Sequence, residues 1–85
     1  MQTTDVELAI RSFLIEHFLF GRAESLRDDV VLLGDLIDSA GVLELITYLQ
    51  DRFAISVEDE EVVPENLDTV TNLVRYVARK LGTSL

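Results

Sequence analysis

Three stretches of the sequence repeat their apolar residues at the spacing of an α-helix, and this feature most limits what the chain can fold into. They cover residues 4–20, 39–53 and 68–82. Because apolar positions that recur every three or four residues share one side of a helix, each stretch has a face to bury. The 85 residues leave room for one domain. We therefore expect an all-α fold, a small antiparallel four-helix bundle of three main helices and one short helix, in a single domain spanning residues 1–85.

Start and stop signals mark the ends of the first and last helices. Thr4 is followed three residues later by Glu7, which is the spacing of a capping box, and Gly21 is placed to end the first helix. Asp68 or Thr69 is a candidate N-cap for the last helix, which a glycine follows.

The apolar face of each helix predicts the core. These faces comprise Val6, Ala9, Ile10, Phe13, Leu14, His17 and Phe20 in the first helix, Val42, Leu45, Ile46, Leu49 and Phe53 in the second, and Val70, Leu73, Val74, Val77 and Leu81 in the last. The first helix carries a second apolar stripe, Leu8, Ile15 and Leu19, on its opposite side. Packing under a loop is the favoured interpretation of this stripe, and contact with a partner is the alternative.

Two connections separate the three helices. Residues 21–38 show no lasting periodicity, which predicts a long loop. Its apolar residues indicate that the loop is pinned to the core: Val30, Val31, Leu32, Leu33, Leu36 and Ile37. Residues 54–68 combine an acidic cluster with the lone Pro64 and support at most one short helix.

Charge and composition limit the classes of partner. The chain has 16 acidic and 7 basic residues, a net charge of −9, which would repel a phosphate backbone. We therefore expect no nucleic acid and no membrane as partners, but docking on basic patches of other proteins, unless the charge serves solubility alone. The absence of cysteine excludes disulfides and thiolate sites. The sequence has neither a signal-peptide pattern nor an apolar run of membrane-span length, so we expect a cytoplasmic protein.

Catalytic and metal sites find little support among these residues. A serine nucleophile needs a nearby base, and the only histidine, His17, is predicted on the core face of the first helix. The pattern G-x-S-x-G is half present around Ser39, because Ile37 occupies its first glycine position. The acidic run 58–61 lacks the alternating ligands and the glycine of a calcium loop. We expect neither an enzyme nor a metal site.

The segment IDSAGVLEL leaves a question about Ser39. Asp38 or Ser39 can cap the second helix, and capping alone would explain either residue. It does not explain Gly41, since glycine in a helix costs up to ~1 kcal/mol relative to alanine. Ala40 and Gly41 would leave the serine hydroxyl open at the positive end of a helix, where an attached phosphate diester is favoured. This indicates an exposed serine that can be modified.

A longer segment around this serine, LLGDLIDSAGVLELITYLQDRFAISV, resembles the signature of acyl carrier proteins and of the related peptidyl and aminoacyl carrier domains. In that signature a D-S pair after a long loop opens the second helix, a glutamate follows, and an acidic-aromatic stretch ends the helix. The matching positions are Asp38, Ser39, Glu44, Leu45, Leu49, Asp51 and Phe53. The resemblance covers nearly all 85 residues.

The resemblance implies a covalent 4′-phosphopantetheine on Ser39, beside Asp38, added from coenzyme A by a phosphopantetheinyl transferase. The thiol of this group would hold acyl or aminoacyl cargo as a thioester, which also agrees with the missing cysteine. Further implied partners are an acyl- or aminoacyl-activating, adenylating enzyme and a downstream synthase or transferase in fatty acid or secondary metabolite biosynthesis. We expect a monomer that contacts these enzymes through the second helix, with partner-binding residues Ala40, Leu43, Glu44, Thr47 and Asp51.

Two positions depart from the family pattern. Ala40 stands where leucine or methionine usually follows the serine, which leaves open which transferase acts, and Arg52 replaces a more typical acidic residue. A small residue and a glycine after D-S resemble specialised free-standing carriers served by dedicated adenylating enzymes. The alternative function is an unmodified helical adaptor that binds a partner helix through the second stripe of the first helix.

Overall fold

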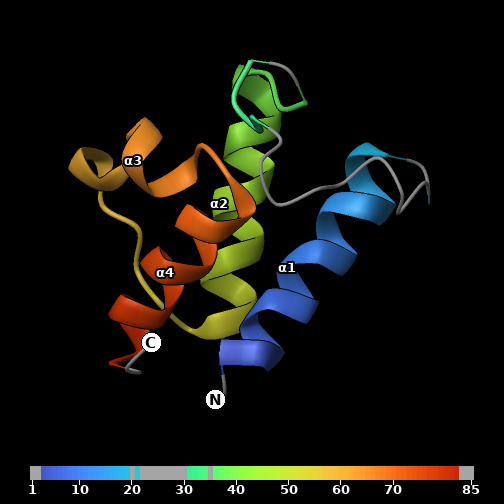
Figure 1. Cartoon of the computed structure of the whole chain (residues 1–85). Coiled ribbons are helices and arrows are strands. Elements are labelled where there is room, and N and C mark those ends of the chain that lie inside the picture. The colour runs from blue at the N-terminus through green and yellow to red at the C-terminus, as the bar shows by residue number, and fades with distance from the viewer. Residues whose placement is uncertain (1–2, 20, 22–30, 35, 83–85) are drawn as a thin grey trace.

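Four α-helices and one short 3₁₀ helix lie in the part of the chain that the structure describes. The computed structural model describes residues 3–19, 21, 31–34 and 36–82. The elements are α1 (Thr3–Phe18), α2 (Ser39–Phe53), η2 (Asp59–Glu61), α3 (Pro64–Leu67) and α4 (Val70–Leu81). Figure 1 shows the three long helices α1, α2 and α4 gathered together, with the short α3 leading into α4. The predicted all-α bundle of three main helices and one short helix is confirmed.

The helix α4 is the element against which the others pack. Helices α1, α2 and α3 all contact it. The short helix expected between the second and last helices is α3, and the three-residue 3₁₀ helix η2 precedes it. Within the described ranges there is no β-strand, and the one paired bridge is the isolated contact between Leu33 and Ile37.

The helix ends follow the local sequence signals in α4 and at the C-terminus of α1, but not at the N-terminus of α1. Gly21 has a φ of +85° and donates its backbone N–H to the carbonyl of Ile15 at 3.0 Å, so it ends α1 as predicted. The Thr69 side chain accepts a hydrogen bond from the backbone N–H of Asn72 at 3.1 Å, and Gly82 ends α4 with a φ of +75°. Thr69 is therefore the N-cap. The predicted capping box at the other end of the fold is wrong, because α1 begins at Thr3 and Thr4 already lies inside its first turn.

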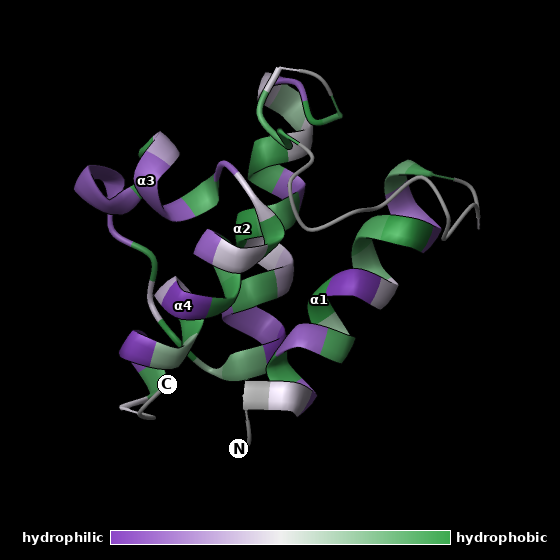
Figure 2. Ribbon diagram, viewed as in Figure 1, coloured by the Kyte–Doolittle hydropathy of each residue, from purple (hydrophilic) through white to green (hydrophobic). Residues whose placement is uncertain are grey.

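The buried residues form one apolar core. In Figure 2 hydrophobic and hydrophilic residues alternate in short blocks along each helix, as expected of helices that bury one face. The buried apolar residues are Val6, Ile10, Leu14 and Leu19, then Leu32 and Ile37, then Leu45, Leu49 and Phe53, and finally Leu67, Val70, Leu73, Val74, Tyr76, Val77 and Ala78. The predicted faces of α2 and α4 are thereby confirmed, with Val42, Ile46 and Leu81 half-buried.

The predicted faces of α1 need correction. His17 is exposed and lies outside the core, and Phe20 lies outside the described residues. The second stripe does not behave as a unit: Leu8 is 59% exposed, Ile15 is half-buried and Leu19 is buried. The stripe therefore packs at its C-terminal end, near the loop, and is open at its N-terminal end.

The end of the loop before α2 is pinned to the core, as predicted. The backbone N–H of Leu32 donates to the carbonyl of Asp68 at 2.6 Å, so the loop is tied to the junction of α3 and α4. Leu32 and Ile37 are buried, and the backbone N–H of Ile37 returns to the carbonyl of Leu32 at 2.7 Å. Val31 is 42% exposed and does not belong to this anchor. Val30 lies outside the described residues.

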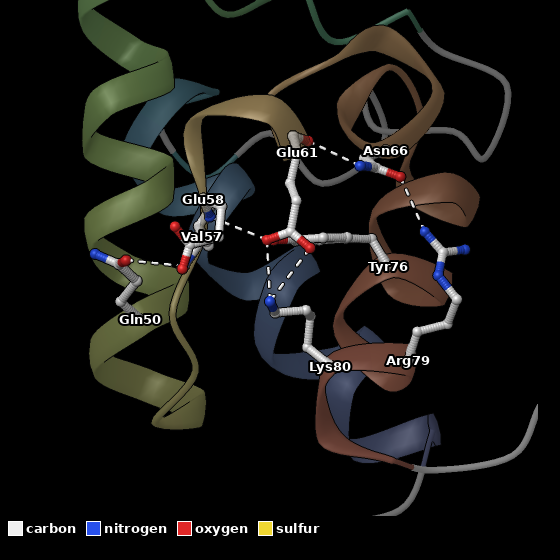
Figure 3. A network of polar contacts seen from close by, with 8 residues as sticks. All are labelled: Gln50, Val57, Glu58, Glu61, Asn66, Tyr76, Arg79 and Lys80. Carbon is white, nitrogen blue, oxygen red and sulfur yellow. Dashed lines mark hydrogen bonds and ion pairs between the residues drawn. The ribbon is translucent and has the colours of Figure 1, made fainter.

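A polar network ties η2 to α4 (Figure 3). The Glu61 carboxylate accepts hydrogen bonds from the backbone N–H of Glu58, from the Tyr76 hydroxyl and from the Lys80 ammonium, each at 3.0 Å. The backbone N–H of Glu58 and then the Lys80 ammonium hold the pKa of Glu61 below its usual value. Burial and then the Glu61 carboxylate raise the pKa of Tyr76 to about 12. The acidic run 58–61 therefore helps to hold η2 against α4.

None of the described helices combines the length and the apolar character needed to cross a membrane.

Candidate functional site

Ser39 is exposed at the first position of α2. The helix is capped by Asp38, whose Oδ1 accepts the backbone N–H of Gly41 at 2.8 Å. Because Asp38 serves as the cap, the Ser39 hydroxyl is left without a hydrogen-bond partner among the described residues. The hydroxyl therefore sits at the positive end of a 15-residue helix with no structural task of its own.

Gly41 has a packing role that was not inferred from the sequence. It is buried, and a Cβ at this position would lie 2.9 Å from Ile37 Cγ2 and 2.9 Å from Phe18 Cε1. Glycine is therefore needed for the close packing of α1 and the loop end on the first turn of α2. That Gly41 also helps to leave the serine hydroxyl open stays a prediction, and the neighbouring Ala40 is exposed, as expected.

A hollow of about 390 Å³ lies beside Ser39, between the end of α1, the loop end and the first turns of α2. Its lining includes the Asp38 cap and the exposed Ala40, with Phe18 and Leu36 as its large apolar members. The remaining lining residues are Gly34, Gly41 and Glu44. The hollow offers a mixed polar and apolar surface that includes both chain neighbours of Ser39, Asp38 and Ala40, and it is large enough for part of a small group.

The residues predicted to bind partners share one exposed side of α2. Ala40, Leu43, Glu44, Thr47 and Asp51 are all exposed. Leu43 is 68% exposed, which is more than the other large exposed hydrophobic residues, and it lies one helical turn from Ser39. The structure thus places these residues on one surface with Ser39, and their contact with partners stays a prediction.

One residue near this surface, His17 of α1, was missed as a surface residue by sequence reasoning. His17 Nε2 pairs with Glu44 Oε2 across the gap between α1 and α2. The imidazole also stacks on Phe13, with ring centroids 4.9 Å apart. Periodicity assigned both residues to the core, which is correct for Phe13 and wrong for His17, because periodicity reports the apolar side of a helix without showing how far the neighbouring helix covers it.

An aromatic stack joins α1 to α2 behind this pair. Phe13 lies 4.1 Å from the Tyr48 ring, centroid to centroid, and the Tyr48 hydroxyl donates to the carbonyl of Ala9 at 2.9 Å. Burial raises the pKa of Tyr48, so the phenol stays protonated and remains a donor at neutral pH. These contacts fix the relative position of the two helices that border the candidate site.

No catalytic or metal arrangement accompanies Ser39 in the described ranges. The histidine pairs with Glu44, and no group of three or more His, Asp or Glu residues in these ranges could hold a metal ion. The site can present a serine hydroxyl for modification and offers no base aimed at it.

The known proteins that resemble this chain all belong to one family. No family model matches the chain. Two relatives from Exiguobacterium sibiricum and Exiguobacterium sp., each named acyl carrier protein, are 45% identical over 40 residues and 43% identical over 44 residues. These two matches span 48% and 53% of the relatives, about half of their length.

Two further matches cover most of both chains. A Serratia sp. protein named probable acyl carrier protein PigG is 31% identical over 75 residues, 82% of this chain and 86% of that protein. The solution structure of a holo acyl carrier protein from Nitrosomonas europaea superposes with a TM-score of 0.75 and 34% identity, over 96% of this chain and 99% of that one. These names also agree with the expectation that the chain is not an enzyme. From its sequence and its fold together, the chain belongs to the acyl carrier protein family.

Proposed function

We propose that this protein carries acyl or aminoacyl cargo as a thioester on a 4′-phosphopantetheine attached to Ser39. The observation that carries the proposal is the Ser39 hydroxyl, exposed and unpartnered among the described residues at the start of α2. Its support is the family and the likeness to a structure described as holo.

The residues around Ser39 fit such a group. The phosphate diester would lie at the N-terminus of α2, where the first-turn N–H groups and the helix dipole favour an anion. Asp38 satisfies the N–H of Gly41 and so holds this turn without using the serine. The hollow beside Ser39 gives space for the part of the group nearest to the chain. The group itself supplies the thiol, which the 85 residues lack because they contain no cysteine.

The partners that we propose are a phosphopantetheinyl transferase, an acyl- or aminoacyl-activating enzyme, and a downstream synthase or transferase. The exposed Glu44 and Asp51 give the α2 surface an acidic character that suits basic docking patches. A specialised free-standing carrier is favoured by Ala40, a small residue directly after the serine. The unmodified adaptor is not proposed, because its binding stripe is broken by the burial of Leu19.

Intact-mass measurement tests the attachment. The purified protein is incubated with coenzyme A and a promiscuous phosphopantetheinyl transferase, and should gain the mass of one 4′-phosphopantetheine. Ser39→Ala should gain nothing, while Ser12→Ala, which removes an exposed serine of α1, should be modified like the wild type. Because Asp38 provides the cap, Ser39→Ala should stay within ~0.5 kcal/mol of wild-type stability. An unmodified wild type, or a modified Ser39→Ala variant, would refute the proposal.

A further inference from the structure

A second hollow lies between α1 and α2 and shares a wall with the hollow beside Ser39. Its volume is about 280 Å³, and its lining is Phe13, His17, Leu43, Glu44 and Thr47. Glu44 also lines the hollow of about 390 Å³ beside Ser39, so the two hollows meet at this residue. In Figure 1 the C-terminal end of α1 and the N-terminal end of α2 diverge. We call the two hollows together the α1–α2 groove.

The two parts of the α1–α2 groove differ in chemistry. The part beside Ser39 is mixed, with the Asp38 carboxylate and the Phe18 ring in its lining. The far part is mainly apolar. One of its walls is the Phe13 ring, and another is Leu43, which is 68% exposed. The groove therefore offers polar and apolar surface next to the serine, and apolar surface farther from it.

The apolar part is formed by contacts that lie behind it. The Phe13 and Tyr48 rings stack at 4.1 Å between the two helices, and the Tyr48 hydroxyl donates to the carbonyl of Ala9 at 2.9 Å. The His17 ring stacks on Phe13 with centroids 4.9 Å apart. These contacts set the spacing of α1 and α2, so the space is present before anything enters it.

The length of the group proposed on Ser39 matches the length of the groove. Thr47 follows Ser39 by eight residues, which is a rise of roughly 12 Å along α2. From its phosphate to its thiol, 4′-phosphopantetheine has about as many chain atoms as four residues of polypeptide, so it spans roughly 14 Å when extended. A thioester at its end can therefore reach the apolar part of the groove.

The junction of the two parts offers an acceptor to the attached group. Glu44 Oε2 pairs with His17 Nε2, which leaves Oε1 without a hydrogen bond among the described residues. The arm of 4′-phosphopantetheine contains two amide N–H groups, and one that passes this point can donate to Oε1. Attachment to Ser39 would also hold the arm near the groove at an effective concentration on the order of millimolar, so weak contacts suffice.

The size of the apolar part limits the cargo that it can hold. Its volume of about 280 Å³ is just below the roughly 300 Å³ at which pockets for drug-sized ligands begin. It therefore has room for a branched or cyclic apolar group about as large as one side chain, and not for a long acyl chain.

We propose that 4′-phosphopantetheine on Ser39 lies along the α1–α2 groove and that the small apolar end of its cargo rests on Phe13 and Leu43. The inference rests on the proposed function, since it places the group that this function requires. It locates the cargo on the outer side of α2, away from the core residues Leu45 and Leu49, which are fully buried.

Heteronuclear NMR of three forms of the protein tests this placement. They are the unmodified protein, the protein modified from coenzyme A, and the protein modified from isovaleryl-coenzyme A, which delivers the arm with a branched cargo already attached. Modification alone should shift the amides of Leu36 and Glu44. The isovaleryl cargo should add shifts at His17 and Thr47, and its methyl groups should give nuclear Overhauser contacts to the Phe13 ring.

A variant that fills the apolar part separates docking in the groove from other effects of the cargo. Thr47→Phe fills this part from an exposed position and should remove both the contacts to Phe13 and the added shift at His17. The matched control is Thr71→Phe, which changes an exposed threonine of α4 that lines neither hollow and should leave both signals unchanged. Both variants should melt like the wild type, as far-UV circular dichroism will check.

The outcomes distinguish this inference from the proposed function. If intact mass shows no modification of the wild type, the proposed function itself fails. If the wild type is modified but the isovaleryl methyl groups do not contact Phe13, or still do so in Thr47→Phe, only the groove inference is overturned. Methyl contacts to Leu45 or Leu49 would place the cargo inside the bundle and would overturn it equally. Shifts at His17 that depend on protein concentration would identify a second copy of the chain as the occupant, with the same consequence.

Discussion

Replacing Gly41 by alanine should destabilise this protein, although the same change in an exposed helix stabilises. The added Cβ would lie 2.9 Å from Ile37 Cγ2, 2.9 Å from Phe18 Cε1 and 3.3 Å from Asp38 Oδ1. Ile37 is 2% exposed and so has little room to move. The third contact is with the oxygen that caps α2. The new methyl group therefore presses on the core and on the helix cap at once.

The expected magnitude is the difference between two opposing terms. Alanine is up to ~1 kcal/mol more favourable than glycine in a helix. Inserting a methyl group into a closely packed site costs about 1–3 kcal/mol. The net result for Gly41→Ala should be a loss of about 1 kcal/mol, which for a domain of this size lowers the Tm by roughly 4–8 °C.

Urea denaturation followed by circular dichroism measures this loss. The control is Ala40→Gly at the neighbouring exposed position, which reports helix propensity alone and should cost up to ~1 kcal/mol. If Gly41→Ala is about 1 kcal/mol more stable than the wild type, the residue behaves as an exposed helical glycine and the packing argument is refuted.

Three further predictions concern the Asp38 cap of α2, the stability of the fold at low pH and the docking surface on α2. Asp38→Ala should lower the free energy of unfolding, measured by urea denaturation, by about 1 kcal/mol, whereas Asp38→Asn should lower it little because asparagine caps a helix equally well. Equal losses in the two variants would argue against the cap. The pKa of Glu61 is lowered in the folded protein, chiefly by the backbone N–H of Glu58. The ionised Glu61 carboxylate therefore contributes its full stabilisation above the unfolded carboxyl pKa of ~4.3, and this stabilisation is lost as the pH falls through the lower folded pKa. Melts over a pH series should show this acid loss in the wild type and less of it in Glu61→Gln. The double variant Glu44→Lys with Asp51→Lys should slow the loading of the modified protein by its activating enzyme. Loading of the wild type should also become slower as the salt concentration rises, because exposed charges are screened over ~8 Å at physiological ionic strength. A double variant that loads as fast as the wild type at low salt would contradict this prediction.

The local sequence by itself determined α2 and the exposure of its first residue. The apolar repeat from Val42 to Phe53 predicted the helix Ser39–Phe53 with both ends correct. It also placed Glu44 and Asp51 on the exposed side. These features depend on the spacing of neighbours in the chain, because one side of a helix follows directly from its 3.6-residue repeat. The sequence likewise narrowed the N-cap of α4 to Asp68 or Thr69, since an N-cap bonds to a residue three positions away, and the structure shows that it is Thr69.

The tertiary structure alone decided the roles of Gly41 and His17. Gly41 is buried because Phe18, from a different helix, packs on the first turn of α2. His17 is exposed because the Phe13 and Tyr48 rings separate α1 from α2 at this level, which leaves the histidine at the edge to pair with Glu44. Periodicity indicates which side of a helix is apolar, but the distance to the neighbouring helix is set by the side chains that meet between them. That distance determines which residues of the apolar side are covered, and it depends on pairs of residues far apart in the chain.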